Sequence, residues 1–135
     1  MKKIQILFAA MLVVCMTSCF KTEAQVDVEV LKDGKPQSGV IVYKFTDEMG
    51  ESTTSYKENA KAQATTNAGG VAHFDLKSPE DFTPSKVGNV EVKETNTFYF
   101  ATFDSNNTRN GFVIVKIATG DKKTVQLEMT DVAID

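Results

Sequence analysis

The chain of 135 residues has few of the side chains that most often carry catalysis or bind metals. Its one histidine is His73, and its two cysteines, Cys15 and Cys19, lie within the first twenty residues. The rest of the chain has no cysteine, so it can form no disulfide and offers no thiol nucleophile. Zinc also lacks its usual set of cysteine and histidine ligands there. A Ser/His/Asp triad would have to use His73, and no nucleophile-elbow motif is present. The composition therefore predicts a protein that is not an enzyme and holds no cofactor or metal.

Positive charge is also scarce, since Arg109 is the only arginine. Removing residues 1–18 takes away Lys2 and Lys3 and no acid, which leaves 13 of the 15 basic side chains against 18 acidic ones. Nucleic-acid binding requires a basic stripe, and docking on anionic lipid requires a basic cluster. An acidic body argues against both kinds of partner.

Long apolar runs are missing except near the start of the chain. Residues 6–16 carry no charge, follow two lysines, and lead into the small polar pair Thr17 and Ser18. This is the layout of a secretory signal peptide, whose apolar core runs about 7–15 residues. A spanning helix needs roughly 20 apolar residues, so the segment is too short for one. The sequence predicts an exported protein.

Two cleavage sites compete after this segment. Residues 16–19, MTSC, resemble the lipobox that is cut before its cysteine, with methionine in place of the usual leucine. A conventional cut after Ala24 would leave the charged Lys21 and Glu23 in the cleavage region. The pattern favours lipidation of Cys19, because acyl chains that contribute about 0.8 kcal/mol per buried methylene form a stable anchor without a spanning helix.

The anchor sets the expected location and organisation. Residues 20–23, FKTE, look like the short charged tails of surface-exported lipoproteins in some Gram-negative bacteria. We expect attachment to the outer membrane through the lipid, with a protein partner on the envelope or outside the cell. The oligomeric state is left open. The predicted organisation is a signal peptide at 1–18, a tether at 19–24, one domain at 25–131 and a tail at 132–135.

Beyond residue 25 apolar side chains recur at every second position, as in half-buried β-strands. In residues 71–76 we expect Ala72, Phe74 and Leu76 on the inner face, while residues 40–45 are apolar on both faces and leave the inner side open. Residues 46–66 are polar, and a short helix and an edge strand fit them equally well. Further apolar residues predicted to face the core are Val26, Val28, Val30, Phe98, Phe100, Phe103, Val125, Leu127 and Met129.

Seven or eight short strands separated by turn signals predict an all-β, antiparallel sandwich. The expected strands include residues 89–93, 98–103, 112–118 and 124–129. No long helical pattern is present to cross between parallel strands, which argues against parallel pairing.

The segments VDVEVLKDGKPQSGVIVYKF and AQATTNAGGVAHFDL resemble the opening half of prealbumin-like and carboxypeptidase-regulatory-like domains. The resemblance covers residues 25–130 and implies a Greek-key β-sandwich of about seven strands, often used as an extracellular module. Hydroxyisourate hydrolases of this fold rely on several histidines and a C-terminal Tyr-Arg-Gly-Ser that this chain lacks, so no activity carries over. The matching positions are Gly34, Pro36, Gly39, Val40, Val42, Thr66, Gly70 and Phe74.

Three function hypotheses follow. The leading one is a non-enzymatic binding or structural module that acts through sandwich loops at residues 46–66 and 104–111 or through a sheet edge. The second is an accessory glycan- or nutrient-binding lipoprotein beside an outer-membrane importer. The third is a hydrolase that uses His73 and its same-face neighbour Asp75. The candidate binding residues are Tyr56, Asp104, Asn106, Asn107 and Arg109.

The sequence offers two further candidate sites, one for calcium and one for a lysine cross-link. Calcium would need carboxylates and amides at residues 47–51 (Asp47, Glu48 and Glu51) or at residues 104–107, but neither stretch has the spacing of a dedicated calcium loop, and solvated turns fit better. Lys32 and Asp131 are the candidates for a lysine amide cross-link of the kind found in collagen-adhesin sandwiches, a bond that also needs a buried acid.

Overall fold

The computed structural model describes residues 22–46, 57–78, 80–82, 85–88, 90–92 and 94–131. Within these ranges the chain is almost entirely β-structure, and its single helical element is the 3-10 turn η1 (Lys57–Asn59). None of the described helical structure is long and apolar enough to cross a membrane. Cys19, Tyr56 and the acids of residues 47–51 lie outside the described ranges.

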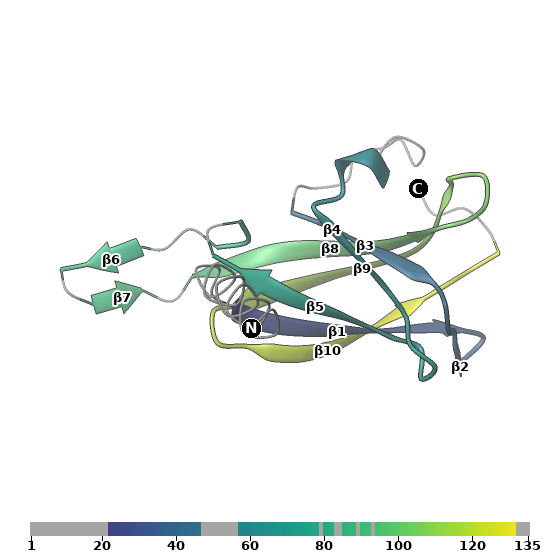
Figure 1. Ribbon diagram of the computed structural model, residues 1–135, viewed down its shortest axis with the longest axis horizontal. Helices are drawn as coiled ribbons and strands as arrows, with labels where there is room; N and C mark the ends of the chain where they lie inside the picture. Colours follow the sequence, from purple (N-terminus) through teal and green to yellow (C-terminus); the bar gives the residue numbers. More distant parts are fainter. Residues whose placement is uncertain are drawn as a thin grey trace, which may run out of the picture.

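The strands form two four-stranded sheets that pack face to face, as Figure 1 shows. A separate two-stranded ribbon joins β6 (Ser85–Val87) to β7 (Val90–Val92). Sheet A contains β1 (Thr22–Lys32), β2 (Lys35–Pro36), β5 (Val71–Lys77) and β10 (Lys122–Glu128), and sheet B contains β4 (Ala62–Thr65), β3 (Ile41–Phe45), β8 (Thr95–Phe103) and β9 (Arg109–Ala118).

One pair of strands corrects the expected antiparallel pattern. β1 and β10 run parallel, with Val28 opposite Val125, whereas the other strand pairs are antiparallel. The lack of crossover helices, which predicted no parallel pairing, does not prevent it here. The strands of sheet B themselves carry the chain back to the starting end of β1.

The core between the sheets confirms the period-two alternation. Val26, Val28 and Val30 of β1 are fully buried, and Phe74 of β5 packs on Phe100 of β8 with ring centroids 5.0 Å apart. Full burial of such side chains contributes about 1.5–3 kcal/mol each, so this layer dominates stability. The other predicted inward residues that lie in or against this core are Ala72, Leu76, Phe98, Val125, Leu127 and Met129.

The strand left undecided by its sequence, β3, places two aromatic rings outside the core. Val42 belongs to the main core, whereas Tyr43 and Phe45 belong to a second apolar cluster on the outer side of sheet B. Phe103, expected in the main core, also packs in this outer cluster. The prediction was wrong for Phe103 because residues 98–103 are apolar on both faces, and only alternate positions share one face.

Three of the residues that carry the family resemblance, Pro36, Thr66 and Gly70, serve turns. Thr66 is buried, and its hydroxyl donates to the carbonyl of Gln37 (2.6 Å) and accepts the N–H of Val40 (2.9 Å). Gly70 has a φ of 80°, and a Cβ there would lie 2.8 Å from the Cβ of Pro36. The position therefore requires glycine both for its conformation and for its close approach to the proline.

Two other expectations are refined. The polar segment contains both alternatives that the sequence left open, because η1 is followed by the edge strand β4. The strand expected at residues 89–93 pairs with β6 in the ribbon instead of joining the sandwich. Gly88, with a φ of 66°, supplies the local turn that brings these two strands together.

The two ends of the sandwich are distinct. Thr22 at the start of β1 pairs with Lys77, the Gly120 N–H donates to the Glu23 carbonyl (2.6 Å), and the Thr119 N–H donates to the Glu94 carbonyl (2.9 Å). We call this the proximal end, and the ribbon projects beyond it in Figure 1. The loop between β8 and β9 lies at the opposite, distal end.

Candidate binding surface

The outer side of sheet B is apolar, unlike the outer side of sheet A. The register aligns Tyr43, Ala101 and Phe112 in one row across three strands and Phe45, Tyr99 and Ile114 in the next. We call these six residues together with Phe103 the aromatic face. Sheet A instead presents polar side chains outward, among them Asp27, Glu29, His73, Asp75, Thr124 and Gln126.

Ring contacts tie the aromatic face into two groups. Tyr43 meets Phe103 edge to face at 5.5 Å, and Tyr99 stacks on Phe112 at 6.2 Å with an interplanar angle of 19°. The guanidinium of Arg109 lies 4.7 Å from the Phe112 ring centroid. Such aromatic and cation–π contacts fix the rings in place, so the surface is preorganised.

The aromatic face is covered on one side and open on the other. Phe45 is only 2% exposed, and Ala60, which follows η1, packs in the same cluster. Ile114 on β9 is 54% exposed, and Tyr99 and Phe112 beside it are half-buried. Among the described residues the only other large exposed apolar side chain is Ile41, which also belongs to sheet B. Apart from Ile41, the accessible apolar surface of the aromatic side of sheet B therefore lies on the β9 side.

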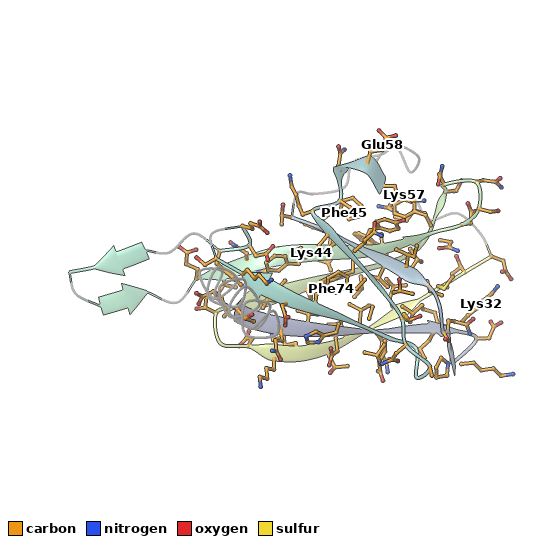
Figure 2. The ribbon with its side chains drawn as sticks, viewed as in Figure 1. Lys32, Lys44, Phe45, Lys57, Glu58 and Phe74 are labelled. Carbon is orange, nitrogen blue, oxygen red and sulfur yellow. The ribbon has the colours of Figure 1, made fainter. Side chains whose placement is uncertain are left out.

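The two segments proposed as binding loops meet at the distal end. Lys57 of η1 donates to Oδ1 of Asn107 (3.1 Å), and its ammonium lies 5.4 Å from the Tyr43 ring centroid. Figure 2 shows Lys57 and Phe45 on the outer side of sheet B, while Phe74 lies between the sheets. The contact joins the β8–β9 loop to the covered edge of the aromatic face.

The acidic residue of that loop has a structural role. Oδ1 of Asp104 accepts the N–H groups of Asn106 (2.8 Å) and Thr108 (3.0 Å), and Asn107 takes a φ of 59°. This local pattern is typical of an Asx turn. Asp104 therefore shapes the loop, and no group of three or more metal-ligating acids, cysteines or histidines is found in the part of the chain that the structure describes.

The structure thus brings together some of the predicted site residues. Asn107 contacts Lys57, and Arg109 is 4% exposed against Phe112, while Asn106 lies exposed in the same loop as Asp104. Sequence reasoning missed Tyr43, Phe112 and Ile114. The available signal was the two-faced apolar pattern of residues 98–103 and 112–115, which exceeds what one core face requires.

The free edge of β9 is capped at both ends. Near the proximal end, Lys123 Nζ donates to the Lys116 carbonyl (2.9 Å), and Oδ2 of Asp121 accepts the Ala118 N–H (2.8 Å). At the distal end Gly111 forms a bridge with Met129. Side chains and a neighbouring segment that occupy edge groups oppose the addition of another strand. The exposed face is therefore a better docking surface than this edge.

An ion pair is buried close to the main core. Lys44 Nζ lies 2.5 Å from Oδ1 of Asp81, with side-chain exposures of 4% and 2%. Oδ2 of Asp81 also accepts the Lys77 N–H (2.8 Å), and Phe82 packs edge to face on Phe98 beside the pair. Residues 80–82 are thus held to sheet B by a charge that their sequence did not indicate.

His73 is solvent-facing, as predicted, and lies between two acids. Nδ1 is 2.6 Å from Oδ1 of Asp27, and Nε2 is 2.9 Å from Oδ1 of Asp75. These hydrogen bonds, first that to Asp27 and then that to Asp75, raise the pKa of His73 above its ordinary value. Both ring nitrogens are engaged, so neither is poised to activate a hydroxyl in this geometry.

Lys32 and Asp131 do meet, with Nζ 2.6 Å from Oδ1. Their side chains are 38% and 81% exposed, and Lys32 lies at one end of the sheets in Figure 2. Water can solvate both groups, and the buried acid that a cross-link requires is not among the contacts of this pair. The arrangement is a surface ion pair, whose hydrogen bond and charge raise the pKa of Lys32.

No family model matches this chain, and the comparison with curated proteins found no match. The two-sheet, all-β architecture is consistent with a β-sandwich. The surface geometry therefore carries the functional argument.

Proposed function

We propose that this protein is a non-enzymatic binding module of the bacterial cell envelope, anchored by lipid at Cys19, that binds a protein partner through the aromatic face. The observation that carries the proposal is the contrast between the two outer surfaces. Sheet A is polar outside, whereas sheet B exposes Ile114 beside Tyr99 and Phe112. Contiguous exposed apolar surface on a soluble domain marks an interaction site.

The proposed anchor agrees with the extent of β1. A cut before Cys19 leaves this strand whole, whereas a cut after Ala24 would remove its first three residues. Those residues include Ala24, which is 4% exposed, and Glu23, whose carbonyl accepts the Gly120 N–H. Cys19 precedes Thr22 by three positions, which span at most about 10 Å. The lipid would hold the proximal end near an outer membrane and direct the distal end outward.

The partner class follows from the chemistry of the surface. Rigid aromatic residues and arginine are enriched at the centres of protein interfaces, and the Tyr99–Phe112 stack with Arg109 has this composition. A prealbumin-like sandwich is a rigid scaffold suited to presenting such a face. Both ring nitrogens of His73 bond to carboxylates, those of Asp27 and Asp75, in the geometry of a surface hydrogen-bond network.

The test is site-specific photo-cross-linking in the native host. A photoreactive amino acid at position 114 is expected to give a discrete protein adduct, and the same group at Thr124, on the outer side of sheet A, is expected to give none. Ile114→Glu should reduce co-purification of that adduct partner at least tenfold, because it places an unpaired charge in the apolar contact. The matched control is Thr124→Glu. Equal capture by both variants would refute the proposed face.

One observation favours the second candidate, a glycan-binding role. Tyr99 and Phe112 are half-buried aromatic rings on the outer side of sheet B, and a sugar ring could pack against them. This function predicts a sugar-dependent rise in melting temperature through binding to the folded state. A broad glycan panel that leaves the melting temperature unchanged would count against it, and the protein-binding proposal would be unaffected.

A further inference from the structure

The four strands of sheet B contain no acidic residue, although the whole chain has 18 acidic side chains and 15 basic ones. Their basic residues are Lys44, which is buried against Asp81, and Arg109 and Lys116 of β9. The strands of sheet A carry both signs of charge, with acids at Glu23, Asp27, Glu29, Asp75 and Glu128. An anion that approaches the outer side of sheet B therefore meets no opposing carboxylate on its strands.

Lys116 extends the aromatic face along β9. Phe112, Ile114 and Lys116 occupy alternate positions of the strand, so their side chains share its outer side. Ile114 and Lys116 are both exposed. A rise of about 3.3 Å per residue puts the Lys116 backbone roughly 13 Å from that of Phe112. A cation thus stands at the proximal end of the exposed apolar surface.

Two further cations lie at the distal end of the same surface. The Arg109 guanidinium is 4.7 Å from the Phe112 ring centroid, and the Lys57 ammonium is 5.4 Å from that of Tyr43. The side chain of Lys57 donates its hydrogen bond to the neutral amide of Asn107. Aromatic rings and amides attract a cation but do not neutralise its charge. The apolar surface is therefore bordered by positive charge at both ends.

The acids nearest in sequence to these cations do not neutralise them. Asp104 and Asp121 accept backbone N–H groups of their own turns, and Glu58 points away from the sheets in Figure 2. In the part of the chain that the structure describes, Lys57 and Lys116 form no ion pair. The charge of these two lysines is therefore available to a partner.

We propose that the aromatic face binds an acidic polypeptide segment, whose apolar side chains pack on Phe112 and Ile114 and whose carboxylates meet Lys116. Lys57 offers a second cation at the distal end. The inference deepens the proposed function and rests on it. Charges around an apolar contact select a complementary partner and speed its approach. A short segment can lie on the acid-free strands alone, whereas nucleic acid or an anionic membrane extends far enough to meet the acids elsewhere on the molecule.

A peptide selection tests the chemistry of the partner. The mature protein is purified from its native host and immobilised through a C-terminal tag, and the probe is a phage-displayed library of random dodecapeptides. Peptides that wild type retains and Ile114→Glu releases report the aromatic face. We expect these peptides to contain aspartate and glutamate at least twice as often as the library does, beside apolar residues.

Matched substitutions at two lysines then separate charge from shape. For one selected peptide, made synthetically, Lys116→Glu should raise the Kd at least fivefold, and Lys116→Arg should leave it within twofold of wild type. The control is Lys35→Glu, which changes an exposed lysine of β2 in sheet A and should also leave the Kd within twofold. In 0.5 M NaCl the wild-type Kd should rise and its difference from Lys116→Glu should shrink, because salt screens exposed charges.

The outcomes separate this inference from the proposed function. Ile114-dependent peptides without an excess of acids, or a Kd unchanged by Lys116→Glu, would refute the acidic partner and leave the aromatic face as a docking surface. Single-stranded DNA or phosphatidylglycerol vesicles that bind with the same dependence on Lys116 would show a general anion site and overturn the assignment to a polypeptide. A selection that yields no Ile114-dependent peptide would refute the inference, while cross-linking at position 114 decides the proposed function by itself.

Discussion

At the residue scale, two lysine–aspartate pairs of similar geometry lie in opposite environments. The Lys44–Asp81 pair is buried, and the Lys32–Asp131 pair is exposed. In low dielectric surroundings a lost partner leaves an uncompensated charge, whereas water compensates an exposed group. The two pairs have nearly the same N–O distance, so their difference in burial decides how much stability is lost when one partner is removed.

Lys44→Met is expected to lower the free energy of unfolding by about 3–5 kcal/mol, because Asp81 remains buried without its cation. Urea denaturation at neutral pH measures the loss. The control is Lys32→Met, expected to cost less than about 1 kcal/mol. In a double-mutant cycle, Lys44→Met with Asp81→Leu should cost less than the sum of the single changes. Equal losses for the two lysine variants would contradict the argument.

His73 should make stability depend on pH. Its pKa is raised in the folded protein by the hydrogen bonds to Asp27 and Asp75, so the folded state binds the proton more tightly than the unfolded state. The stabilisation is full below about pH 6.5, the ordinary pKa of a histidine, and is lost as the pH rises through the folded-state pKa. Melting temperatures of wild type and His73→Gln should differ most near pH 5 and converge above neutrality.

The effect at His73 should be modest, because its side chain is half exposed and salt screens exposed charges. In 1 M NaCl the two melting curves should lie closer together at every pH. A difference between wild type and His73→Gln that stays constant from pH 5 to 8 would show that the two acids do not hold the proton on this histidine.

At the element scale, the sequence predicted where strands form better than which face of each strand points into the core. The alternation in β1, β5 and β10 identified the inward side chains because each has one polar face. The strands β3, β8 and β9 are apolar on both faces, and a period of two cannot say which of two apolar faces is inside. The aromatic face was therefore invisible to the sequence argument, and Phe103 was assigned to the wrong layer.

Predictions for the candidate residues were correct for contacts that are local in the sequence and missed contacts between distant residues. Asp104, Asn106 and Asn107 occupy a loop that the sequence marked correctly as a turn. The contact of Asn107 with Lys57 joins residues 50 positions apart, and the Lys44–Asp81 pair joins residues 37 positions apart. Contacts between residues this far apart depend on how the two sheets pack. The spacing of residues along the sequence does not reveal that packing.

β9 and β10 approach each other closely at Gly111. A Cβ at this position would clash with Cδ2 of Leu127 and Oγ1 of Thr102. Gly111→Ala is therefore expected to cost about 1–3 kcal/mol in unfolding free energy through overpacking. Gly69→Ala serves as the control, since its Cβ would only touch Oδ1 of Asn67 at 3.4 Å. Denaturant titrations that place both variants within 0.5 kcal/mol of wild type, roughly the noise for surface changes, would contradict this packing.

At the scale of the whole molecule, the two ends of the sandwich are built from different segments. The proximal end gathers the start of β1 and the roots of the ribbon, while the β8–β9 loop and its contact with η1 lie distally. The lipid proposed at Cys19 would place the proximal end at the membrane and the distal end away from it. The aromatic face lies on the side between these ends, where the proposed partner could reach it.

The extent of β1 predicts where the folded body can begin. A protein that starts at Gln25 loses the buried Ala24 and its pairing with Leu76, whereas one that starts at Thr22 keeps both. We expect the shorter form to be less stable by roughly 1–3 kcal/mol, from lost burial and lost hydrogen bonds. Thermal melting followed by circular dichroism compares the two forms. Identical melting temperatures would mean that Thr22, Glu23 and Ala24 do not contribute to the sheet.

The parallel pairing of β1 with β10 has a consequence for how the chain is made. Glu29 and Gln126, which face each other across this pair, are 97 positions apart, so β1 gains its parallel neighbour only after the last strand has been synthesised. Contacts of such long range close slowly, because the loop entropy must be lost first. If the chain is threaded N-terminus first through a translocation channel, as the proposed export requires, it would emerge with this sheet still incomplete. The topology would then delay completion of this sheet until export is nearly finished, so that the chain stays competent for transport.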